Sequence, residues 1–369
     1  MRLGAASATV DPAGGETMSR ETLSLIICTY CRPQAVATLL AALRTQTRLP
    51  ETILVVDASP DAATAVVVRA AAQTWPAAGG LRYLLAPAAQ RGLTRQRNYG
   101  IAHAPGSIIA FLDDDTVPEP TYFAKLLACF AAHPDAAGVG GLITNEVAWR
   151  AGTSAVAATL GTFRYNGWER REDYRWRVRR LVGLAGGSPP GWLPRHGHGR
   201  SLGFLPPDGA TYRVEFLMGC AAAWRRTVFT QHAFSHYFAG YGLYEDLDFS
   251  VRVSRHQPLY FCTRARLAHY HAAGGRPQAF RYGVMVVRNG WYVWRQRWPR
   301  PAVADGLRWW AISLLLTGCR LGDAVRGPQR RQAVAETLGR LWGMIGLAAR
   351  KPRPMGSRPP APPQLVEVA

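Results

Sequence analysis

Five acidic side chains, in two groups far apart in the chain, have the types and spacing that best suit chemistry. Asp113, Asp114 and Asp115 come directly after a strongly apolar run, and Glu245 and Asp246 follow much later. Adjacent carboxylates repel one another, and ionised oxygens inside a protein need hydrogen-bond donors or a cation. A hard divalent metal would satisfy them. The sequence therefore predicts metal-held diphosphate chemistry beside a carboxylate base.

Apolar, β-branched runs alternate with segments of helical spacing in the part of the chain that carries these residues. The expected strands are residues 23–29, 52–56, 81–85, 107–112, 138–144, 212–217 and 259–270, and the expected helices are residues 34–44, 62–73, 94–102, 122–132 and 249–255. Strands that alternate with helices form parallel α/β sheets. We expect an α/β fold with a Rossmann-like, mostly parallel mixed sheet flanked by helices.

Several polar residues stand at or just past the predicted strand ends. Thr29, Tyr30, Asp57 and Asp113 are in this position, and ligands of open parallel sheets bind outside the carboxyl ends of the strands. No G-x-G-x-x-G follows the first strand, and the G-x-x-x-x-G-K-S/T loop is absent. The sheet should therefore gather these residues into one crevice that is neither a dinucleotide site nor a P-loop.

Arginine dominates the charge of the chain. The formal net charge of this 369-residue protein is +20, and Lys125 and Lys351 are its only lysines. This predicts anionic partners such as phosphates, phospholipid headgroups or nucleic acid, or it reflects the coding bias of a GC-rich genome. The six cysteines are scattered, which favours a reducing cytosol; Cys28 and Cys31 form a C-x-x-C without a second pair of zinc ligands.

The two ends of the chain lack helix and strand patterns. Residues 1–21 are small and polar, without the apolar core of a signal peptide, and predict a disordered leader. Residues 351–369 have repeated prolines and predict a disordered tail. The longest apolar stretch near the end, residues 309–319, is about half a membrane span. We expect no secretion and no transmembrane helix.

Two further segments differ from the α/β pattern. Residues 147–207 are polar, aromatic and rich in Gly and Pro, which predicts a long surface insertion. Residues 278–350 predict an amphipathic helical region in which arginines alternate with Trp291, Trp294, Trp298, Trp309 and Trp310. Such helices either lie in the headgroup layer of an anionic membrane or cover the sheet domain with their apolar stripe.

Six short blocks, in this order, resemble the family-2 inverting glycosyltransferases, which have the GT-A fold. The blocks are LIICTYCRP at 25–33, VVDAS at 55–59, GLTRQRNYG at 92–100, FLDDD at 111–115, Gly219 with Arg225 and Arg226, and YEDLD at 244–248. The likeness covers about residues 23–275. It implies a GT-A domain over residues 22–277, with a nucleotide-binding half over about 22–116 and an acceptor half over about 117–277.

The resemblance implies which residues meet the donor nucleotide. The candidates are Thr29, Tyr30, Arg32, Asp57, Arg95, Arg97, Asn98, Asp113 and Asp114. Asp57 would accept an N–H of the base, or it caps the turn before Ser59. Arg95 and Arg97, with Arg91, would meet the diphosphate, or they lie on a solvated helix face.

A metal site is also implied. The D-x-D element of the family holds Mg²⁺ or Mn²⁺ on the donor diphosphate, which gives Asp115 and Asp113 as ligands here. His271, or His269, is the third candidate ligand, because alternation along a strand puts both on one face. The structural alternative is an acid-rich turn near two histidines of the fold.

Glu245 and Asp246 resemble the family's general-base motif. An acceptor hydroxyl is a poor nucleophile, so a carboxylate must take its proton while the oxygen attacks the anomeric carbon. The resemblance assigns this role to Asp246 and lets Glu245 orient the acceptor. Asp248 would cap a helix over 249–255 or pair with Arg252. A single displacement of this kind inverts the anomeric centre.

The acceptor residues implied by the resemblance are Gly219, Cys220, Trp224 and Arg225. They match a strand of small residues and an arginine pair on the acceptor side, although the commoner pattern has a polar residue such as Asn near Cys220. The insertion at 147–207 is longer than usual for the family. We expect acceptor specificity to reside there.

The function expected from these features is sugar transfer, of hexosyl- or deoxyhexosyltransferase type, from a nucleotide sugar to a glycan or lipid-linked saccharide of the cell envelope. The reaction would take place in the cytoplasm, at the inner face of the membrane if the C-terminal helices bind it. The alternatives are a sugar-nucleotide-binding protein, a nucleotidyltransferase and an arginine-rich nucleic-acid-binding protein. A nucleotidyltransferase would carry a glycine-rich, lysine-bearing loop where Arg32 and Pro33 stand, and no nucleic-acid reader motif is found.

Overall fold

The computed structural model describes residues 21–77, 79–152, 161–238, 240–271, 274 and 277–354. The predicted leader, except Glu21, and the predicted tail from residue 355 onward lie outside the described residues. No helix among the described residues has both the length and the apolar character needed to cross a membrane.

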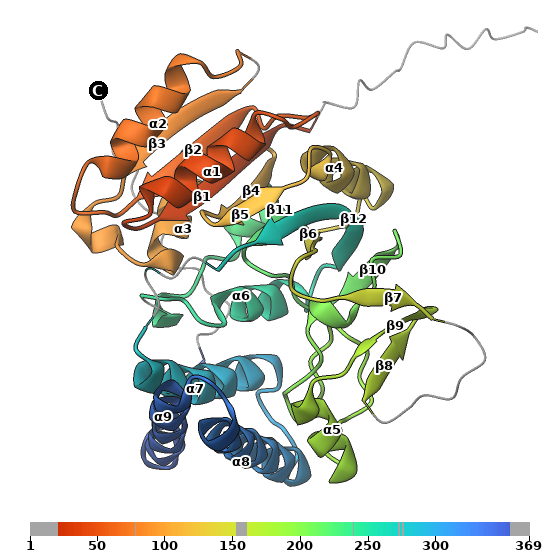
Figure 1. The fold of residues 1–369 in the computed structure, drawn as a ribbon. Helices are drawn as coiled ribbons and strands as arrows, with labels where there is room; N and C mark the ends of the chain where they lie inside the picture. The colour runs from red at the N-terminus through yellow and green to blue at the C-terminus, as the bar shows by residue number, and fades with distance from the viewer. Residues whose placement is uncertain are drawn as a thin grey trace, which may run out of the picture.

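A mixed sheet of nine strands, counted over the described residues, forms the centre of the upper part of the molecule (Figure 1). Its order is β10 (Thr211–Val214), β12 (Leu259–His269), β6 (Gly138–Ile143), β11 (Ala221–Arg225), β4 (Ile108–Asp113), β1 (Leu23–Thr29), β2 (Thr52–Asp57) and β3 (Gly80–Leu85), and β5 (Thr116–Pro118) pairs with β12. The strands β4, β1, β2 and β3 are parallel, and β11 runs antiparallel between β4 and β6. The predicted fold class is confirmed.

Both faces of the sheet are buried under helices. The helices are α1 (Pro33–Leu43), α2 (Ala63–Gln73), α3 (Leu93–His103), α4 (Tyr122–Ala132) and α6 (Glu245–Val253). Leu25 and Ile27 of β1 face the core under α1, α2 and α4, whereas Ile26 faces the core under α3 and α6. This is why the strand reads as a continuous apolar run. Pro33 starts α1 because its fixed φ suits the first helical position.

The insertion at 147–207 contains regular structure that its polar sequence did not lead us to expect. It forms a three-stranded sheet of β7 (Trp149–Ala151), β9 (Trp168–Arg171) and β8 (Thr162–Tyr165), followed by α5 (Tyr174–Leu181). Arginines pack on aromatic rings in place of aliphatic side chains: the Arg200 guanidinium lies 4.4 Å from the Trp176 ring centroid, and that of Arg170 lies 4.3 Å from Phe204. Arginine stems and planes therefore supply much of this small core.

Three helices follow the sheet domain: α7 (Ala279–Arg297), α8 (Val303–Arg326) and α9 (Arg330–Ala349). They lie together at the end of the molecule opposite α2 (Figure 1). Trp291, Trp294 and Trp309 are buried against one another, and Trp294 Nε1 donates to the carbonyl of Arg195 at 2.7 Å. The rings of these three tryptophans face the protein. They therefore follow the expectation that the helices pack on the rest of the protein with their apolar stripe.

Candidate active site

The carboxyl ends of the parallel strands meet at one edge of the sheet, as expected. Thr29 pairs with Asp57 across β1 and β2, and Cys28 pairs with Asp113 across β1 and β4. The antiparallel strand β11 begins at this edge, because Ala221 pairs with Leu112. The turn that contains Gly219 is thereby brought beside Asp113.

Arg97 joins the two acidic groups of the sequence. Its guanidinium is buried, pairs through Nη1 with Glu245 Oε1, and lies 3.3 Å through Nη2 from Asp113 Oδ1. Nη2 also donates to the carbonyl of Gly219 at 3.1 Å. Burial raises the pKa of Glu245 to about 8, against the opposing effect of Arg97. A single buried cation therefore holds together carboxylates from α6 and from the end of β4.

Asp246 is held at the start of α6. Its Oδ2 accepts the N–H of Gly219 at 2.9 Å, and its Oδ1 accepts the N–H of Leu247 at 2.8 Å. Burial raises the pKa of this carboxyl above its ordinary value, which Arg97 and the two N–H donors partly oppose. Both oxygens keep lone pairs for a further partner. This is the environment of a fixed carboxylate that can take up a proton.

The helix that carries Asp246 starts earlier than expected. Tyr244, with a left-handed φ of 68°, directly precedes α6, so the helix begins at Glu245 instead of at residue 249. Asp248 therefore lies within the first turn and does not cap the helix, which corrects one of the two roles expected for it. The other expected role is present, since Arg252 Nη2 lies 2.9 Å from Asp248 Oδ2.

A cavity of about 640 Å³ has Asp246 in its wall. It lies between the sheet domain, the insertion and the helices α7 and α8. Its lining residues include Trp176, Tyr244, Tyr282 and Arg340. The Asp246 carboxylate thus lines a space to which aromatic residues also contribute.

Asp113, Asp115 and His269 could hold a metal ion. Each offers one ligand atom, and the three atoms lie within 4.8 Å of one another. His269 Nε2 is 3.1 Å from Asp115 Oδ1. Burial disfavours a charged imidazole, but the hydrogen bonds with Asp115 and other neighbours raise the pKa of His269 to about 12. The group therefore favours positive charge, and its carboxylate oxygens and imidazole nitrogen fit a divalent cation.

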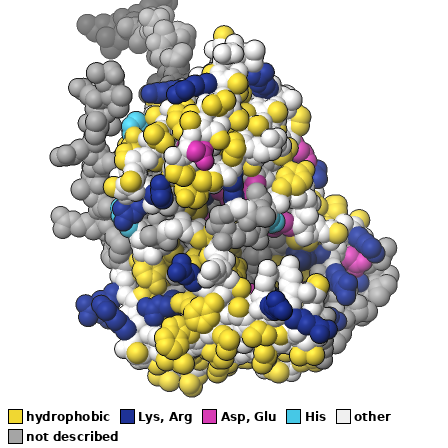
Figure 2. Space-filling view, turned by 60° about the vertical axis from the view of Figure 1, so that its left-hand side comes forward, with side chains coloured by type: hydrophobic (Ala, Val, Ile, Leu, Met, Phe, Trp, Pro, Cys, Tyr) yellow, Lys and Arg dark blue, Asp and Glu magenta, His cyan; other side chains and the backbone are white. Residues whose placement is uncertain are grey.

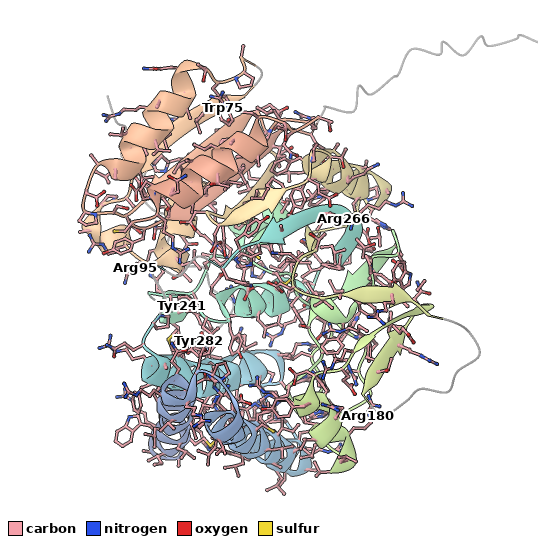
Figure 3. All side chains as sticks on the ribbon, in the orientation of Figure 1. Trp75, Arg95, Arg180, Tyr241, Arg266 and Tyr282 are labelled. Carbon is pink, nitrogen blue, oxygen red and sulfur yellow. The ribbon has the colours of Figure 1, made fainter. Side chains whose placement is uncertain are left out.

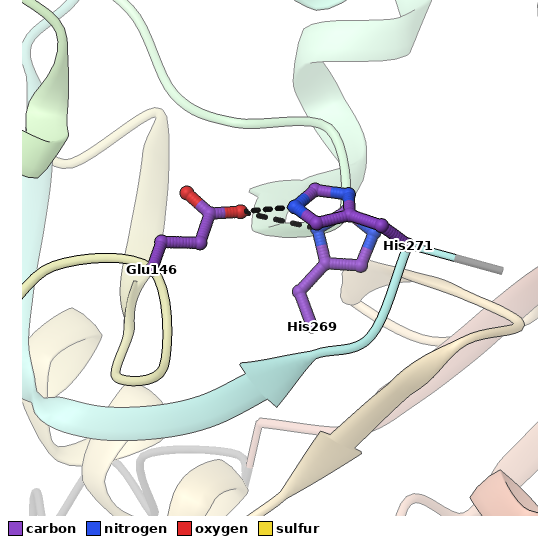
Figure 4. A group of neighbouring side chains, drawn as sticks. All are labelled: Glu146, His269 and His271. Atoms are coloured by element: carbon purple, nitrogen blue, oxygen red, sulfur yellow. Dashed lines mark hydrogen bonds and ion pairs between the residues drawn. The ribbon is translucent and has the colours of Figure 1, made fainter. Parts of the chain in front are cut away.

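His271 lies beside this group but is directed to another residue (Figure 4). Its Nε2 is 2.8 Å from Glu146 Oε1, and the His269 and His271 rings are 4.0 Å apart. Glu146 was missed by sequence reasoning because it belongs to no motif; its only signal is its position after the buried strand β6. Glu146, His269 and His271 form a second group of ligand atoms within 4.8 Å. The structure thus places His269, more directly than His271, next to Asp115.

A known protein family matches part of this chain. Residues 24–183 match the family model described as glycosyl transferase family 2. The chain carries a glycosyl transferase family 2 domain. No curated protein matches the sequence significantly.

Several solved structures are similar to this chain. The mannosyltransferase PcManGT from Pyrobaculum calidifontis, in complex with GDP-Man and Mn²⁺, is 16% identical over 88% of each chain, with a TM-score of 0.50. GalNAc-T7 with UDP, GalNAc and Mn²⁺ is 17% identical over 73% of this chain and 48% of its own, with a TM-score of 0.46. TarS 1–349 of S. aureus with UDP is 13% identical over 86% of this chain and 80% of its own, with a TM-score of 0.45. The chain spans about half the length of GalNAc-T7. The GT-A-type fold is confirmed by the first of these similarities.

Thr29, Arg32 and Asp114 form a hydrogen-bonded network at the same edge of the sheet. Thr29 Oγ1 donates to Asp114 Oδ2 at 2.7 Å, and Arg32 Nη1 donates to Asp114 Oδ1 at 2.9 Å. Burial raises the pKa of Asp114 to about 6 although both contacts oppose it. Arg32 Nη1 also lies 3.6 Å from Asp115 Oδ2. Asp114 thus positions Arg32 next to the candidate metal ligand Asp115. Tyr30 is exposed, and the Arg91 guanidinium lies 5.5 Å from its ring centroid.

Three other candidate nucleotide residues have partners within the protein. Asp57 is fully buried and accepts hydrogen bonds from the N–H of Ser59 and from the Tyr83 hydroxyl. The bond from Ser59 is the turn cap that was the alternative role for Asp57. Asn98 clamps the backbone of Phe234 through both ends of its amide. Arg95 lies on the outer side of α3 (Figure 3), where Nη1 donates to the carbonyl of Ala89. Contacts of these three with a donor stay predictions.

Two of the four acceptor candidates lie away from the cavity. Trp224 is buried in the core, with its ring 4.8 Å from that of Phe249. Arg225 lies at the opposite edge of the sheet, where it pairs with Glu21, because β11 runs away from the site. Gly219 and Cys220 remain at the site edge. Only the first end of β11 reaches the site, so Trp224 and Arg225, later in the strand, do not line the cavity.

Gly219 occupies a position that a side chain would disrupt. A Cβ added there would lie 2.6 Å from Arg97 Nη1 and 2.8 Å from Glu245 Oε1. We expect Gly219→Ala to separate Arg97 from Glu245 and to lower the free energy of unfolding by about 1–3 kcal/mol. The melting temperature and the activity should both fall. The matched control is Gly318→Ala, in α8, where a Cβ meets nothing within 4 Å. Alanine should stabilise that helix by up to about 1 kcal/mol. An unchanged Gly219→Ala protein would contradict the close packing described.

Proposed function

We propose that the protein is an inverting glycosyltransferase that moves a sugar from a nucleotide-sugar donor to a hydroxyl of a glycan or lipid-linked saccharide. The observation that carries the proposal is the Arg97 junction. It ties Asp113, on the donor side, to Glu245, and the next residue, Asp246, faces the cavity. Donor phosphates and an acceptor hydroxyl can therefore approach the same point from two sides.

Asp246 acts as the general base in this proposal. An acceptor hydroxyl in the cavity loses its proton to a carboxylate oxygen of Asp246 while its own oxygen attacks the anomeric carbon. The bond from that carbon to the nucleoside diphosphate breaks in the same step, and the configuration inverts. The N–H groups of Gly219 and Leu247 fix the carboxylate for this proton transfer. Glu245, paired with Arg97, positions the turn that carries the base.

Asp113, Asp115 and His269 would hold the divalent cation, Mg²⁺ or Mn²⁺. Such an ion neutralises the charge that develops on the departing diphosphate. Arg32, which contacts Asp114 and lies near Asp115, adds a fixed positive charge at the same edge. The mannosyltransferase with the shared fold was solved with GDP-Man and Mn²⁺, which supports a nucleotide-sugar donor and a manganese-type site for this chain as well.

The cavity favours a saccharide acceptor. Trp176, Tyr244 and Tyr282, all partly exposed, line it and bring aromatic rings and hydroxyl groups to one space. Part of this wall belongs to the insertion, so acceptor specificity is assigned to that segment and to α7 and α8. We place the reaction in the cytoplasm, with a membrane-linked saccharide as one of the two acceptor types.

The experiment that tests this function is a donor-hydrolysis and binding screen against UDP-, GDP- and dTDP-sugars, with Mg²⁺, Mn²⁺ or EDTA. We expect one donor to bind and release its nucleoside diphosphate only with metal. Asp115→Ala should lose both, because it removes a ligand from the cluster. The control is Asp135→Ala, whose carboxylate lies outside the cavity lining and accepts a hydrogen bond from the Tyr260 hydroxyl. Absence of metal-dependent binding of every donor would overturn the proposal.

A further inference from the structure

The outer faces of α8 and α9 expose a continuous set of large apolar side chains. They are Val303, Leu307, Leu314, Leu321 and Val325 of α8 and Val334, Leu338, Leu341, Trp342 and Ile345 of α9, and their exposed fractions range from 41% to 81%. Within each helix they recur at spacings of three, four or seven residues. Side chains at these spacings lie along one face of a helix. We call this set the α8–α9 apolar face.

The two helices lie side by side in opposite directions. Only residues 327–329 separate them, and Arg320 of α8 pairs with Glu336 of α9 at 2.8 Å, the two residues being equally far from the connection. Their inner faces carry Trp309 and Met344 into the core with α7. The apolar face is therefore the side of this helix pair that points away from the protein. The apolar face thus consists of one side of α8 and one side of α9.

The helical region that carries this surface has an excess of positive charge. Residues 279–354 contain fourteen Arg and Lys but only three acidic residues, Asp305, Asp323 and Glu336, so this part carries more than half of the +20 net charge. All three carboxylates form ion pairs, Asp305 with Arg195, Asp323 with Arg175 and Arg320, and Glu336 with Arg320 and Arg340. Each acidic side chain is therefore paired with an arginine, and the net charge of the region is positive.

A second cavity, of about 1120 Å³, opens at the end of the apolar face. Its lining includes Arg288 and Arg295 of α7 and Arg350, Lys351 and Arg353 after α9, and no acidic side chain. A Cβ on Gly346 would lie 2.9 Å from Arg288 Nη1, so this cavity adjoins the turn of α9 that carries Trp342 and Ile345. Guanidinium and ammonium groups around one space suit a phosphate group. The cavity and the apolar face are thus neighbouring parts of one surface.

We propose that the α8–α9 apolar face docks on an anionic lipid bilayer and that the neighbouring cation-lined cavity takes a lipid phosphate headgroup. Figure 2 shows hydrophobic side chains gathered over the lower end of the molecule, with Lys and Arg side chains above them on both sides. An apolar strip that enters the acyl boundary, with cations at headgroup level, is the pattern of an interfacial helix. The inner face of α8 lines the cavity of Asp246, so docking would hold the acceptor cavity next to the bilayer. The proposal does not depend on the sugar transferred.

The test is flotation of the full chain with vesicles of pure phosphatidylcholine and with vesicles that contain about one-third phosphatidylglycerol. We expect binding to the anionic vesicles, with a loss of about tenfold or more in the double variant Leu338→Gln/Ile345→Gln and in Arg350→Gln/Lys351→Gln. The matched controls are Val66→Gln on α2, at 61% exposure, and Arg82→Gln on β3, both at the far end of the molecule. They should bind as the unchanged protein does. Because Leu338, Ile345, Arg350 and Lys351 are exposed, the two double variants should have the same thermal unfolding temperature as the unchanged protein.

Other occupants of this surface give different results. Equal binding to neutral and anionic vesicles, or binding that the double variants leave unchanged, would overturn the proposal. A dimer in sedimentation velocity that Leu338→Gln/Ile345→Gln dissociates, without vesicle binding, would assign the face to a second copy of the chain. Binding of inorganic diphosphate that Arg350→Gln/Lys351→Gln abolishes, again without vesicle binding, would assign the cavity to a soluble phosphate compound.

Discussion

Asp246→Asn should lower kcat by about 10²–10⁴-fold while metal-dependent binding of the donor is retained. Asparagine keeps the shape of the side chain and can still accept the N–H of Gly219, but it cannot take up the proton of an acceptor hydroxyl. The measurement is steady-state transfer with the donor identified by the screen, together with calorimetric titration of that donor. In the unchanged enzyme, burial raises the pKa of Asp246, so the acid limb of kcat/KM should lie above the pH at which an ordinary aspartate titrates.

The control for this variant is Asp135→Asn, which changes a carboxylate outside the cavity and should leave kcat and the pH profile as they were. Loss of donor binding in Asp246→Asn would mean that the residue serves the donor side and not the acceptor proton. Full activity in Asp246→Asn would remove Asp246 from the mechanism and leave the buried Glu245 as the remaining carboxylate of the motif.

Arg97→Ala should destabilise the fold by about 3–5 kcal/mol and abolish metal-dependent donor binding. The variant leaves Glu245 buried without its cation and removes the partner of Asp113, so two carboxylates lose the same counter-charge. The carbonyl of Gly219 loses its donor as well. Urea denaturation measures the first effect, and titration with the donor and Mn²⁺, at a temperature where the variant is folded, measures the second.

The matched comparison is Arg95→Ala, two residues earlier in α3, whose guanidinium reaches only the carbonyl of Ala89 among the hydrogen bonds described. Its free energy of unfolding should change by no more than about 0.5 kcal/mol. If Arg97→Ala and Arg95→Ala have equal free energies of unfolding, the contacts of Arg97 with Asp113 and Glu245 do not stabilise the fold. The conservative Arg97→Lys should recover only part of the loss, because an ammonium group cannot bridge two carboxylates and a carbonyl in the planar geometry of a guanidinium.

Local patterns in the sequence determined the elements that build the site. The apolar runs within 23–29 and 108–113 become buried strands because their apolar residues alternate between two cores. The helix at 34–44 was predicted within one residue, because Val36, Leu39, Leu40 and Leu43 repeat with the helical period and Pro33 suits the first helical position. The order of strands and helices then gathers Thr29, Asp57 and Asp113 at one edge, which is a consequence of parallel topology alone.

Only the tertiary structure decided what these residues contact. No pattern in α3 distinguishes Arg97, which joins Asp113 to Glu245, from Arg95, which lies outside the junction, because the difference is the direction each faces in the fold. The same holds for His269 and His271, which alternate on one face of a strand pattern: His269 contacts both Asp115 and Glu146, whereas His271 contacts Glu146. Trp224 and Arg225 match a motif but follow a strand away from the site. Amino-acid type and spacing determine secondary structure and the edge at which a site forms, whereas the partner of each charge depends on contacts between residues far apart in the chain, which local periodicity does not encode.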